Sequence, residues 1–353
     1  MNADGQPVAL LSLATAVPEH VLSQADAKQL ARDLFGMRTA LFQKLEPVFD
    51  NAGIDRRHMV CPPDWYRGDH GWKARGEVYL RAAEALYEEA ACKALAAAGL
   101  EARDVDALVT VSTTGIATPS LEARLAGRMG FRADAERVPV FGLGCAGGVS
   151  GLALASRIAR SGRGRTVLFV TVELCSTSVR LDKLTKANIV ASALFADGAA
   201  AAVLRPGCGG IAAIGAGAEK LWPDTIGIMG WDIDDPGLGV VFDQAIPPFV
   251  EANLASGVAD ILNSVARARA SLAAFICHPG GAKVIAAIES SLGLGEGALV
   301  HERAVLRAHG NMSAPTVLFV LQRAIAAGLA GPSLMLALGP GFTTSGLMVD
   351  RAA

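Results

Sequence analysis

Apolar residues follow two different periods along this chain, and the change from one to the other marks its predicted elements. Residues 138–159, VPVFGLGCAGGVSGLALASRIA, begin like a strand and continue with Ala, Leu and Ile at helical spacing. A glycine-flanked Cys145 lies at the change. We predict a strand, a sharp turn carrying Cys145, and a helix whose positive dipole end favours a thiolate nucleophile suited to acyl transfer. The alternative is a small buried cysteine in a packing corner.

The rest of the first half also alternates between strand and helix patterns. Strands are expected at 7–17, 105–113 and 166–174. Helices are expected within 23–50, with Ser23 as N-cap, and over 77–98, ended by Gly99. Residues 54–76 are expected to be irregular, and ASALFADGAAAAVLRP at 191–206 is expected to form a hairpin at its Ala-Asp-Gly turn.

The pattern then repeats. Residues 209–220 are similar to the opening strand, 271–290 to the strand and helix from 105 onward, and 333–350 to 191–206. The stretch 311–328 takes the place of the Cys145 helix. Strands and helices that alternate twice over indicate an α/β fold of two similar βαβαβ-type halves. We expect an N-terminal half over 1–207 and a C-terminal half over 208–353.

Composition and charge limit the function classes. With 353 residues, 52% of them hydrophobic and 19% charged, the chain is typical of a globular protein with a large core. A net charge of −2 gives no reason to expect nucleic-acid or membrane-surface binding, so an anionic substrate would need local basic residues. No apolar run reaches the ~18 residues of a membrane span, and the N-terminus lacks a basic leader, so we expect a cytoplasmic protein. Six cysteines without CxxC spacing indicate neither a metal site nor a disulfide framework.

Five motifs in order then point to a family. They are GLGCAGG, ALFADGAAA, CHPGGAKVI, HGNMSAPTVLFVL and ALGPGF. Together they resemble a type III polyketide synthase, the chalcone-synthase-like branch of the thiolase superfamily, over nearly the whole chain. The resemblance implies a thiolase fold with α-β-α-β-α layers and a homodimer. It also implies decarboxylative condensation of malonyl-CoA onto a cysteine-bound acyl starter, with coenzyme A thioesters as substrates and no cofactor or metal.

The resemblance assigns four catalytic residues: Cys145 as nucleophile, His278, Asn311, and Phe195 as the gating aromatic. An imidazolium at His278 would lower the pKa of the cysteine. His278 Nε2 and the Asn311 amide would donate to the enolate oxygen, and Phe195 would form an apolar wall beside the leaving CO₂. Considered singly, His278 fits a turn residue, Asn311 a helix N-cap and Phe195 a core residue.

The resemblance also places the substrate cavity. Its lining positions are Thr113, Thr114, Cys175, Ser178, Val240 and Ser313. Thr118 stands where plant members carry a methionine that crosses the dimer interface. Because Val240 replaces a phenylalanine of the plant enzymes, we expect room for a long acyl starter and an alkylpyrone or alkylresorcinol product. The alternative is that other side chains fill this space.

Coenzyme A carries phosphates, so basic residues should line the entrance. Lys44, Arg56 and Arg57 are the candidates from the segment where the family binds CoA, and an ordinary solvated face is the alternative. Gly280 and Gly281 would let the backbone approach the pantetheine arm.

Three other functions remain open. A ketoacyl-ACP synthase III shares the Cys-His-Asn set and makes one condensation, but usually reads His-Gln-Ala-Asn where this chain has His278 and Pro279 followed by two glycines. HMG-CoA synthase is less favoured because its general acid is a glutamate. A non-catalytic thiolase-fold subunit is disfavoured because Cys145, His278, Asn311 and Phe195 are all present.

Overall fold

A computed structural model describes residues 7–36, 40–180, 182–207 and 209–352, so Cys208 lies outside the described residues. Within these ranges nine strands form one sheet in the order β11-β12-β13-β8-β1-β7-β6-β4-β5. The N-terminal half contributes β1 (Val8–Ala16), β4 (Ala107–Val111), β5 (Glu136–Val140), β6 (Val167–Leu174) and β7 (Asp197–Pro206). The C-terminal half contributes β8 (Ala212–Leu221), β11 (Ala274–Cys277), β12 (Ser333–Gly339) and β13 (Thr343–Asp350). The predicted repetition of strands is therefore present, and both halves share one sheet.

Strand β1 joins the two halves. It pairs antiparallel with β7 from Val8 to Ala16 and with β8 only from Val8 to Leu10. The sheet thus continues across β1 from one half into the other.

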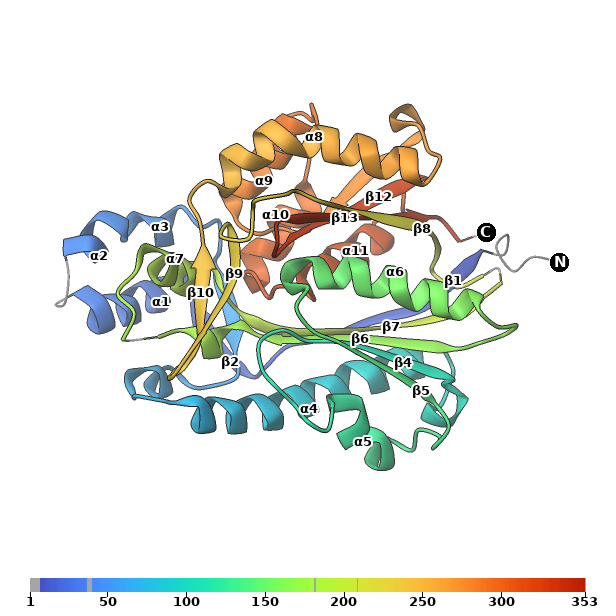
Figure 1. Cartoon of the computed structure of the whole chain (residues 1–353), viewed down its shortest axis with the longest axis horizontal. Helices are drawn as coiled ribbons and strands as arrows, with labels where there is room; N and C mark the ends of the chain where they lie inside the picture. Colours follow the sequence, from blue (N-terminus) through green and yellow to red (C-terminus); the bar gives the residue numbers. More distant parts are fainter. Residues whose placement is uncertain (1–6, 37–39, 181, 208, 353) are drawn as a thin grey trace.

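Helices divide the molecule into layers, as Figure 1 shows. Helices α6 (Gly147–Arg160) and α11 (Thr316–Ala326) lie in the middle. Helices α4 (Trp72–Ala97) and α5 (Leu121–Met129) cover one outer face, and α8 (Ile246–Ser264) and α9 (Ala282–Ser291) cover the other. Three buried hydrophobic clusters lie between these layers. The expected α-β-α-β-α arrangement is confirmed.

The two central helices approach each other very closely at their N-terminal turns. A Cβ on Gly148 would lie 2.2 Å from the carbonyl oxygen of Ala314 and 2.7 Å from Val317 Cγ1. A glycine is therefore required where α6 meets the backbone that leads into α11.

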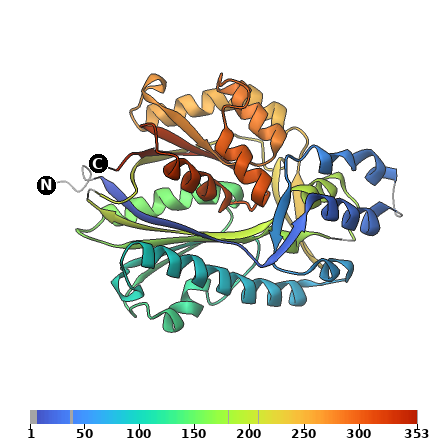
Figure 2. The same ribbon diagram turned by 180° about the vertical axis from the view of Figure 1, so that it is seen from behind.

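A smaller group of elements lies at one end of the layers, as Figure 2 shows from behind. Its helices are α1 (Gln24–Ala31), a π-helical turn η2 (Arg32–Gly36), α2 (Ala40–Leu45), α3 (Pro47–Asp50) and α7 (Lys186–Leu194). Two ribbons accompany them: β2 (His20–Ser23) with β3 (Arg56–Met59), and β9 (Met229–Asp234) with β10 (Gly237–Phe242). The remaining elements are helix α10 (Val300–His309) and the 3₁₀ turns η3 (Pro63–Arg67), η4 (Ala102–Asp104), η5 (Gly144–Ala146), η6 (Cys175–Ser178) and η7 (Arg269–Ser271).

Several local predictions can be compared with these elements. Ser23 caps α1 by accepting from Asp26 N, and Gly99, with φ +67°, follows the end of α4, so both predictions are confirmed. The hairpin predicted at 191–206 is wrong. Helix α7, capped by Thr185, runs to Leu194, and only then does the chain extend into β7. The alanine-rich sequence fits either state, and packing decides between them.

The described helices include none with the length and hydropathy needed to cross a membrane. The same residues hold no group of three or more His, Cys, Asp or Glu suited to a metal ion. Within them, Cys61, Cys92, Cys145, Cys175 and Cys277 are free thiols.

Candidate active site

Cys145 occupies the turn that the sequence predicts. Strand β5 ends at Val140, η5 carries Cys145, and α6 begins two residues later. Gly144 has φ +48°, and a Cβ there would lie 2.7 Å from Pro340 Cδ, so only glycine fits this turn without strain. The predicted strand, turn and helix are confirmed.

His278 and Asn311 come from the C-terminal half. His278 directly follows β11, donates its backbone N–H to Leu336 O at 2.8 Å, and is 4% exposed. Neither of its ring nitrogens has a hydrogen-bond partner. Asn311 forms an isolated bridge with Phe195, in which Asn311 N donates to Leu194 O and Ala196 N donates to Asn311 O, both at 2.9 Å.

The three polar residues meet in one small cavity. A space of about 20 Å³ is lined by Cys145, His278, Gly280 and Asn311, with apolar side chains around them. The Asn311 amide donates from Nδ2 to Gly280 O at 3.0 Å and accepts from Ser313 N at 2.8 Å through Oδ1. Because an amide nitrogen carries two hydrogens, one N–H remains for a ligand. The cavity thus combines a thiol, an unpaired imidazole and an amide donor.

Desolvation shifts both the thiol and the imidazole toward their neutral forms. It raises the pKa of Cys145 to about 11, although a hydrogen bond from Ser313 lowers it in part. Burial also lowers the pKa of His278 to about 4. Both shifts oppose the expected thiolate–imidazolium pair, which stays a prediction. A neutral histidine with a free nitrogen can instead act as the base that takes the Sγ proton.

A second space of about 40 Å³ also opens at Cys145. Three of the predicted cavity residues line it: Cys175, Val240 and Ser313. Phe195 lines it too. The structure thus brings these four side chains together beside the sulfur.

A third cavity of about 180 Å³ is lined in part by η6. It contains the predicted residues Thr114 and Ser178, with Trp72, Ile116 and Leu238 among its apolar wall. Residues of one short turn line both spaces: Cys175 at the start of η6 lines the space at the sulfur, and Ser178 at its end lines this larger cavity.

The other two substrate candidates lie elsewhere. Thr113 is buried, and its hydroxyl accepts from Gly144 N at 3.3 Å, so it supports the Cys145 turn. Thr118 is exposed. Its predicted place at a dimer interface stays a prediction.

Two features of this site escaped the sequence interpretation. Glu173 is fully buried and accepts from Thr113 N at 2.9 Å and from the Thr114 hydroxyl at 2.7 Å. Burial raises the pKa of this carboxyl to about 7. The signal was a single acid in the apolar strand TVLFVTVEL. The other feature is the β9–β10 ribbon. The ring of its Trp231 meets the ring of Phe195 edge-on, with 6.2 Å between the ring centroids, and Trp231 lines the space at the sulfur.

Four of the five expected CoA-binding residues lie either on the surface or at the cavity with Cys145. Lys44 on α2 and Arg56 on β3 are exposed, and their contact with CoA stays a prediction. Gly280 and Gly281 are buried at the start of α9, where Gly280 lines the cavity with Cys145.

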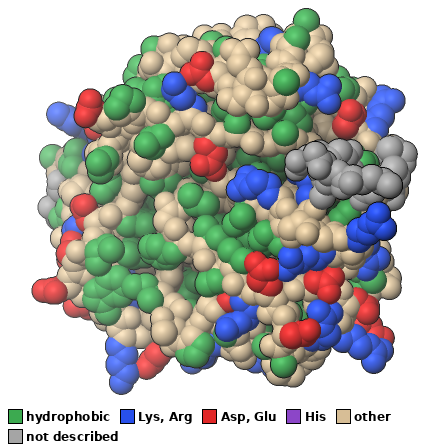
Figure 3. Space-filling view, turned by 45° about the vertical axis from the view of Figure 1, so that its right-hand side comes forward, with side chains coloured by type: hydrophobic (Ala, Val, Ile, Leu, Met, Phe, Trp, Pro, Cys, Tyr) green, Lys and Arg blue, Asp and Glu red, His purple; other side chains and the backbone are tan. Residues whose placement is uncertain are grey.

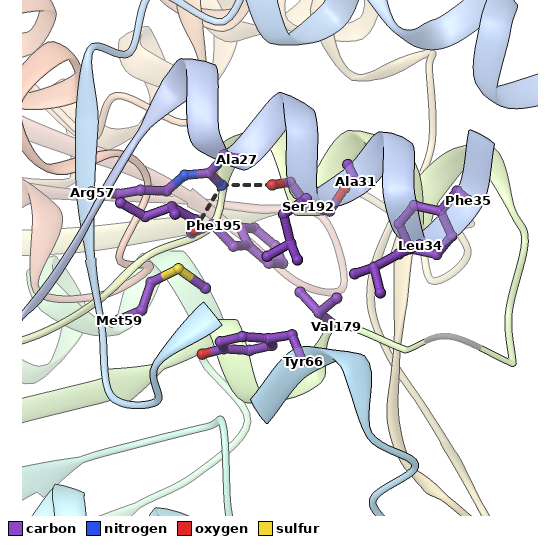
Figure 4. Close-up of a pocket in the computed structure, with 12 residues that line it drawn as sticks. Ala27, Ala31, Leu34, Phe35, Arg57, Met59, Tyr66, Val179, Ser192 and Phe195 are labelled. Atoms are coloured by element: carbon purple, nitrogen blue, oxygen red, sulfur yellow. Dashed lines mark hydrogen bonds between the residues drawn. The ribbon is translucent and has the colours of Figure 1, made fainter. Parts of the chain in front are cut away.

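Arg57 does not lie on the entrance surface, and the expectation that it binds CoA phosphates is wrong. Neighbouring residues of a strand point to opposite faces, and in β3 this turns Arg56 outward and Arg57 inward. Arg57 is 1% exposed, and Nη1 donates to Ser192 O at 2.6 Å and Phe195 O at 3.1 Å, as Figure 4 shows.

Comparison with known proteins gives a consistent result. Family models for chalcone and stilbene synthases match the chain, the N-terminal domain over residues 1–208 and the C-terminal domain over 213–352. The chain is 41% identical over 339 residues to a 1,3,6,8-tetrahydroxynaphthalene synthase of Streptomyces peucetius subsp. caesius, covering 93% of this chain and 89% of the relative. It is 34% identical to a putative chalcone synthase of Bacillus subtilis (strain 168), covering 96% and 97%.

Solved structures agree. The crystal structure of 1,3,6,8-tetrahydroxynaphthalene synthase from Streptomyces coelicolor A3(2), a bacterial type III polyketide synthase, superposes with a TM-score of 0.91 at 27% identity, covering 98% of this chain and 99% of the other. The expected thiolase fold is confirmed.

Proposed function

The chain belongs to the chalcone and stilbene synthase family and is a type III polyketide synthase; within that activity, we propose that Cys145 carries the growing acyl chain while His278 and Asn311 stabilise the enolate. The observation that supports these roles is the single cavity that joins the thiol, the unpaired imidazole and the amide donor. The enzyme is an acyltransferase that uses acyl-CoA and malonyl-CoA. The ketoacyl-ACP synthase III alternative is not favoured, because the N-terminal and the C-terminal family models of chalcone and stilbene synthases each match their half of the chain.

Loading begins with a proton transfer. His278 takes the Sγ proton of Cys145, and the sulfur forms a bond to the carbonyl carbon of the acyl-CoA. The bond from that carbon to the CoA sulfur breaks, and the leaving thiolate takes the proton back from His278. The products are the acyl-enzyme and free CoA, with His278 neutral again.

Extension uses the same donors for a different oxygen. In malonyl-CoA the bond between the carboxylate and the methylene carbon breaks, CO₂ leaves, and the electron pair forms a thioester enolate. The enolate oxygen accepts from His278 Nε2 and from the free N–H of Asn311. Its carbon then attacks the acyl carbon on Cys145, and the carbon–sulfur bond breaks to release Cys145 as a thiolate, which attacks the next acyl thioester directly.

We propose a long acyl starter and an alkylpyrone or alkylresorcinol product. The space at the sulfur is small, but η6 also lines a further 180 Å³, with Trp72, Ile116 and Leu238 in its wall. An acyl chain that passes Cys175 and Val240 would reach this volume by displacing one short turn. Each methylene that moves from water into an apolar channel contributes ~0.8 kcal/mol.

A second product class is favoured by one observation. The relative that is 41% identical over 339 residues is named a 1,3,6,8-tetrahydroxynaphthalene synthase. An enzyme of that kind needs room for a folded polyketide at the sulfur, where Trp231 and Phe195 lie edge-on.

One experiment separates these products. Purified enzyme is given malonyl-CoA alone or with acetyl-, hexanoyl- and longer acyl-CoA, and the products are identified by mass spectrometry. The proposal is supported if the enzyme makes alkylated products and if kcat/KM for the acyl-CoA starter rises with the length of its chain. A naphthalene product from malonyl-CoA alone, unaffected by starters, contradicts it.

The variant Val240→Phe sharpens the same assay. A phenylalanine should fill part of the channel and lower kcat/KM for long starters by orders of magnitude while short starters are spared. Overpacking itself costs ~1–3 kcal/mol, so the melting temperature is measured first. A uniform loss across chain lengths would show that Val240 does not line the acyl channel.

We also propose a homodimer. Strand β5 is the edge of the sheet, and Phe141 next to it is 56% exposed. Figure 3 shows hydrophobic side chains gathered across the middle of one face of the molecule. An unpaired edge strand with an exposed phenylalanine at its end is a typical site for a second copy.

A further inference from the structure

The C-terminal end of α7 is held from outside the helix. The last carbonyls of a helix have no donors within it and need other partners. Ser192 O accepts from Arg57 Nη1 at 2.6 Å, Ala193 O from Gln24 Nε2 at 3.1 Å, and Leu194 O from Asn311 N at 2.9 Å. Two of these three donors are side chains from other elements, and the third is the backbone of Asn311.

Arg57 and Gln24 form one unit, which we name the α7 clamp. Arg57 Nη2 donates to Gln24 Oε1 at 3.0 Å, while Nη1 bonds both Ser192 O and Phe195 O. Burial lowers the pKa of Arg57 to about 10, so its side chain stays charged at neutral pH. A cation at a helix C-terminus complements the negative end of the helix dipole.

The clamp lies directly behind the active site. Figure 4 shows Arg57 and Phe195 at one small pocket, about 30 Å³ in volume, with α1 and Tyr66 around it. Phe195 also lines the space at Cys145, so its ring separates the clamp from the sulfur. Because Phe195 bridges Asn311, any shift of the Phe195 carbonyl also moves the backbone of Asn311.

We propose that Arg57 is a positioning residue for decarboxylation: through the α7 clamp it fixes the Phe195 ring and the Asn311 amide against the malonyl group. This inference rests on the roles given to Phe195 and Asn311 in the proposed function. It assigns Arg57 to the chemical step, since a buried guanidinium bonded to backbone carbonyls makes no contact with CoA phosphates.

The test measures malonyl-CoA decarboxylation in Arg57→Met. We expect kcat to fall about 10–10²-fold, because a misplacement of ~1 Å in a catalytic group has effects of that size. The KM for malonyl-CoA should stay within about twofold, and the rate of Cys145 alkylation by iodoacetamide should be unchanged. Arg57→Lys should recover part of kcat, since an ammonium can still donate to the Phe195 carbonyl.

Arg160→Met is the matched control. Arg160 lies at the end of α6 and donates from Nη2 to Ile214 O and Gly215 O, so this variant also removes a guanidinium bonded to two carbonyls, but away from the site. Its kcat should match the wild type. If Arg57→Met does not fold, Gln24→Leu removes the other residue of the α7 clamp. This variant should lower kcat by about 3–10-fold and leave the KM for malonyl-CoA unchanged.

Other outcomes are decisive. If Arg57→Met raises the KM for malonyl-CoA and leaves kcat unchanged, Arg57 acts in CoA binding and the proposal is overturned. Equal losses of kcat in Arg57→Met and Arg160→Met would also overturn it. Asn311→Ala is measured in parallel. If it leaves decarboxylation intact, the proposed function fails; if it lowers decarboxylation while the Arg57 and Gln24 variants do not, only the clamp proposal fails.

Discussion

Helices α6 and α11 lie side by side at the centre of the molecule, yet the turns before them differ. The turn before α6 follows the edge strand β5 and carries Cys145. The turn before α11 follows helix α10, and its Asn311 bridges Phe195 of the other half. The two turns converge because α6 packs against the backbone that leads into α11, so the thiol of one turn and the amide donor of the other line the same cavity.

Removing the thiol is expected to have the largest effect. Cys145→Ala should abolish acyl loading and product formation, because no other group at the turn can carry the acyl chain. The fold should persist, since a small apolar residue at a helix start costs little structure. Mass spectrometry of the acyl-enzyme, product analysis and the melting temperature check this. Wild-type turnover in the variant would refute the assignment.

The second prediction isolates the other turn. Cys145→Gln should keep malonyl-CoA decarboxylation and lose condensation, because the enolate needs donors but no thiol. Adding Asn311→Ala to that variant should lower CO₂ release by about 10²–10³-fold, the usual cost of one oxyanion donor. CO₂ release from malonyl-CoA is the measurement, and an unchanged rate would remove Asn311 from this role.

The smallest expected effect comes from separating the two turns. In Gly148→Ala the new methyl group would meet the Ala314 backbone, so we expect a loss of ~1–3 kcal/mol in the free energy of unfolding and a fall of up to ~10²-fold in kcat. Gly127→Ala in α5 is the control, because a Cβ there has no atom within 4 Å. That variant should gain about 0.5–1 kcal/mol from helix propensity and keep its activity. Equal stability of the two variants, by denaturant unfolding, would contradict the close approach.

Features set by local pattern could be predicted from the sequence. The strand–turn–helix around Cys145 follows from the change of hydrophobic period and the glycines that flank it. The repeat of that pattern at 311–328 gave the place of α11, which packs beside α6. The motifs around His278 and Asn311 then supplied the candidate polar groups.

Features set by tertiary packing could not be predicted. Which of two adjacent arginines on β3 turns inward depends on what covers each face, and a four-residue strand without apolar alternation does not reveal it. The segment before Phe195 is rich in alanine, which fits helix and strand alike, so the hairpin predicted there is wrong and α7 forms instead. The direction in which desolvation shifts the pKa values of Cys145 and His278 depends on their surroundings in the fold, which sequence spacing does not give.

The central place of β1 has a consequence for how the chain is made. Residues 8–16 are synthesised long before their partners, which are β7 at 197–206 and β8 at 212–221. Strand β1 therefore cannot pair with β7 or β8 until more than half of these 353 residues have been synthesised. Such distant pairing slows folding and leaves apolar strand edges exposed meanwhile, so we expect the incomplete chain to be prone to aggregation.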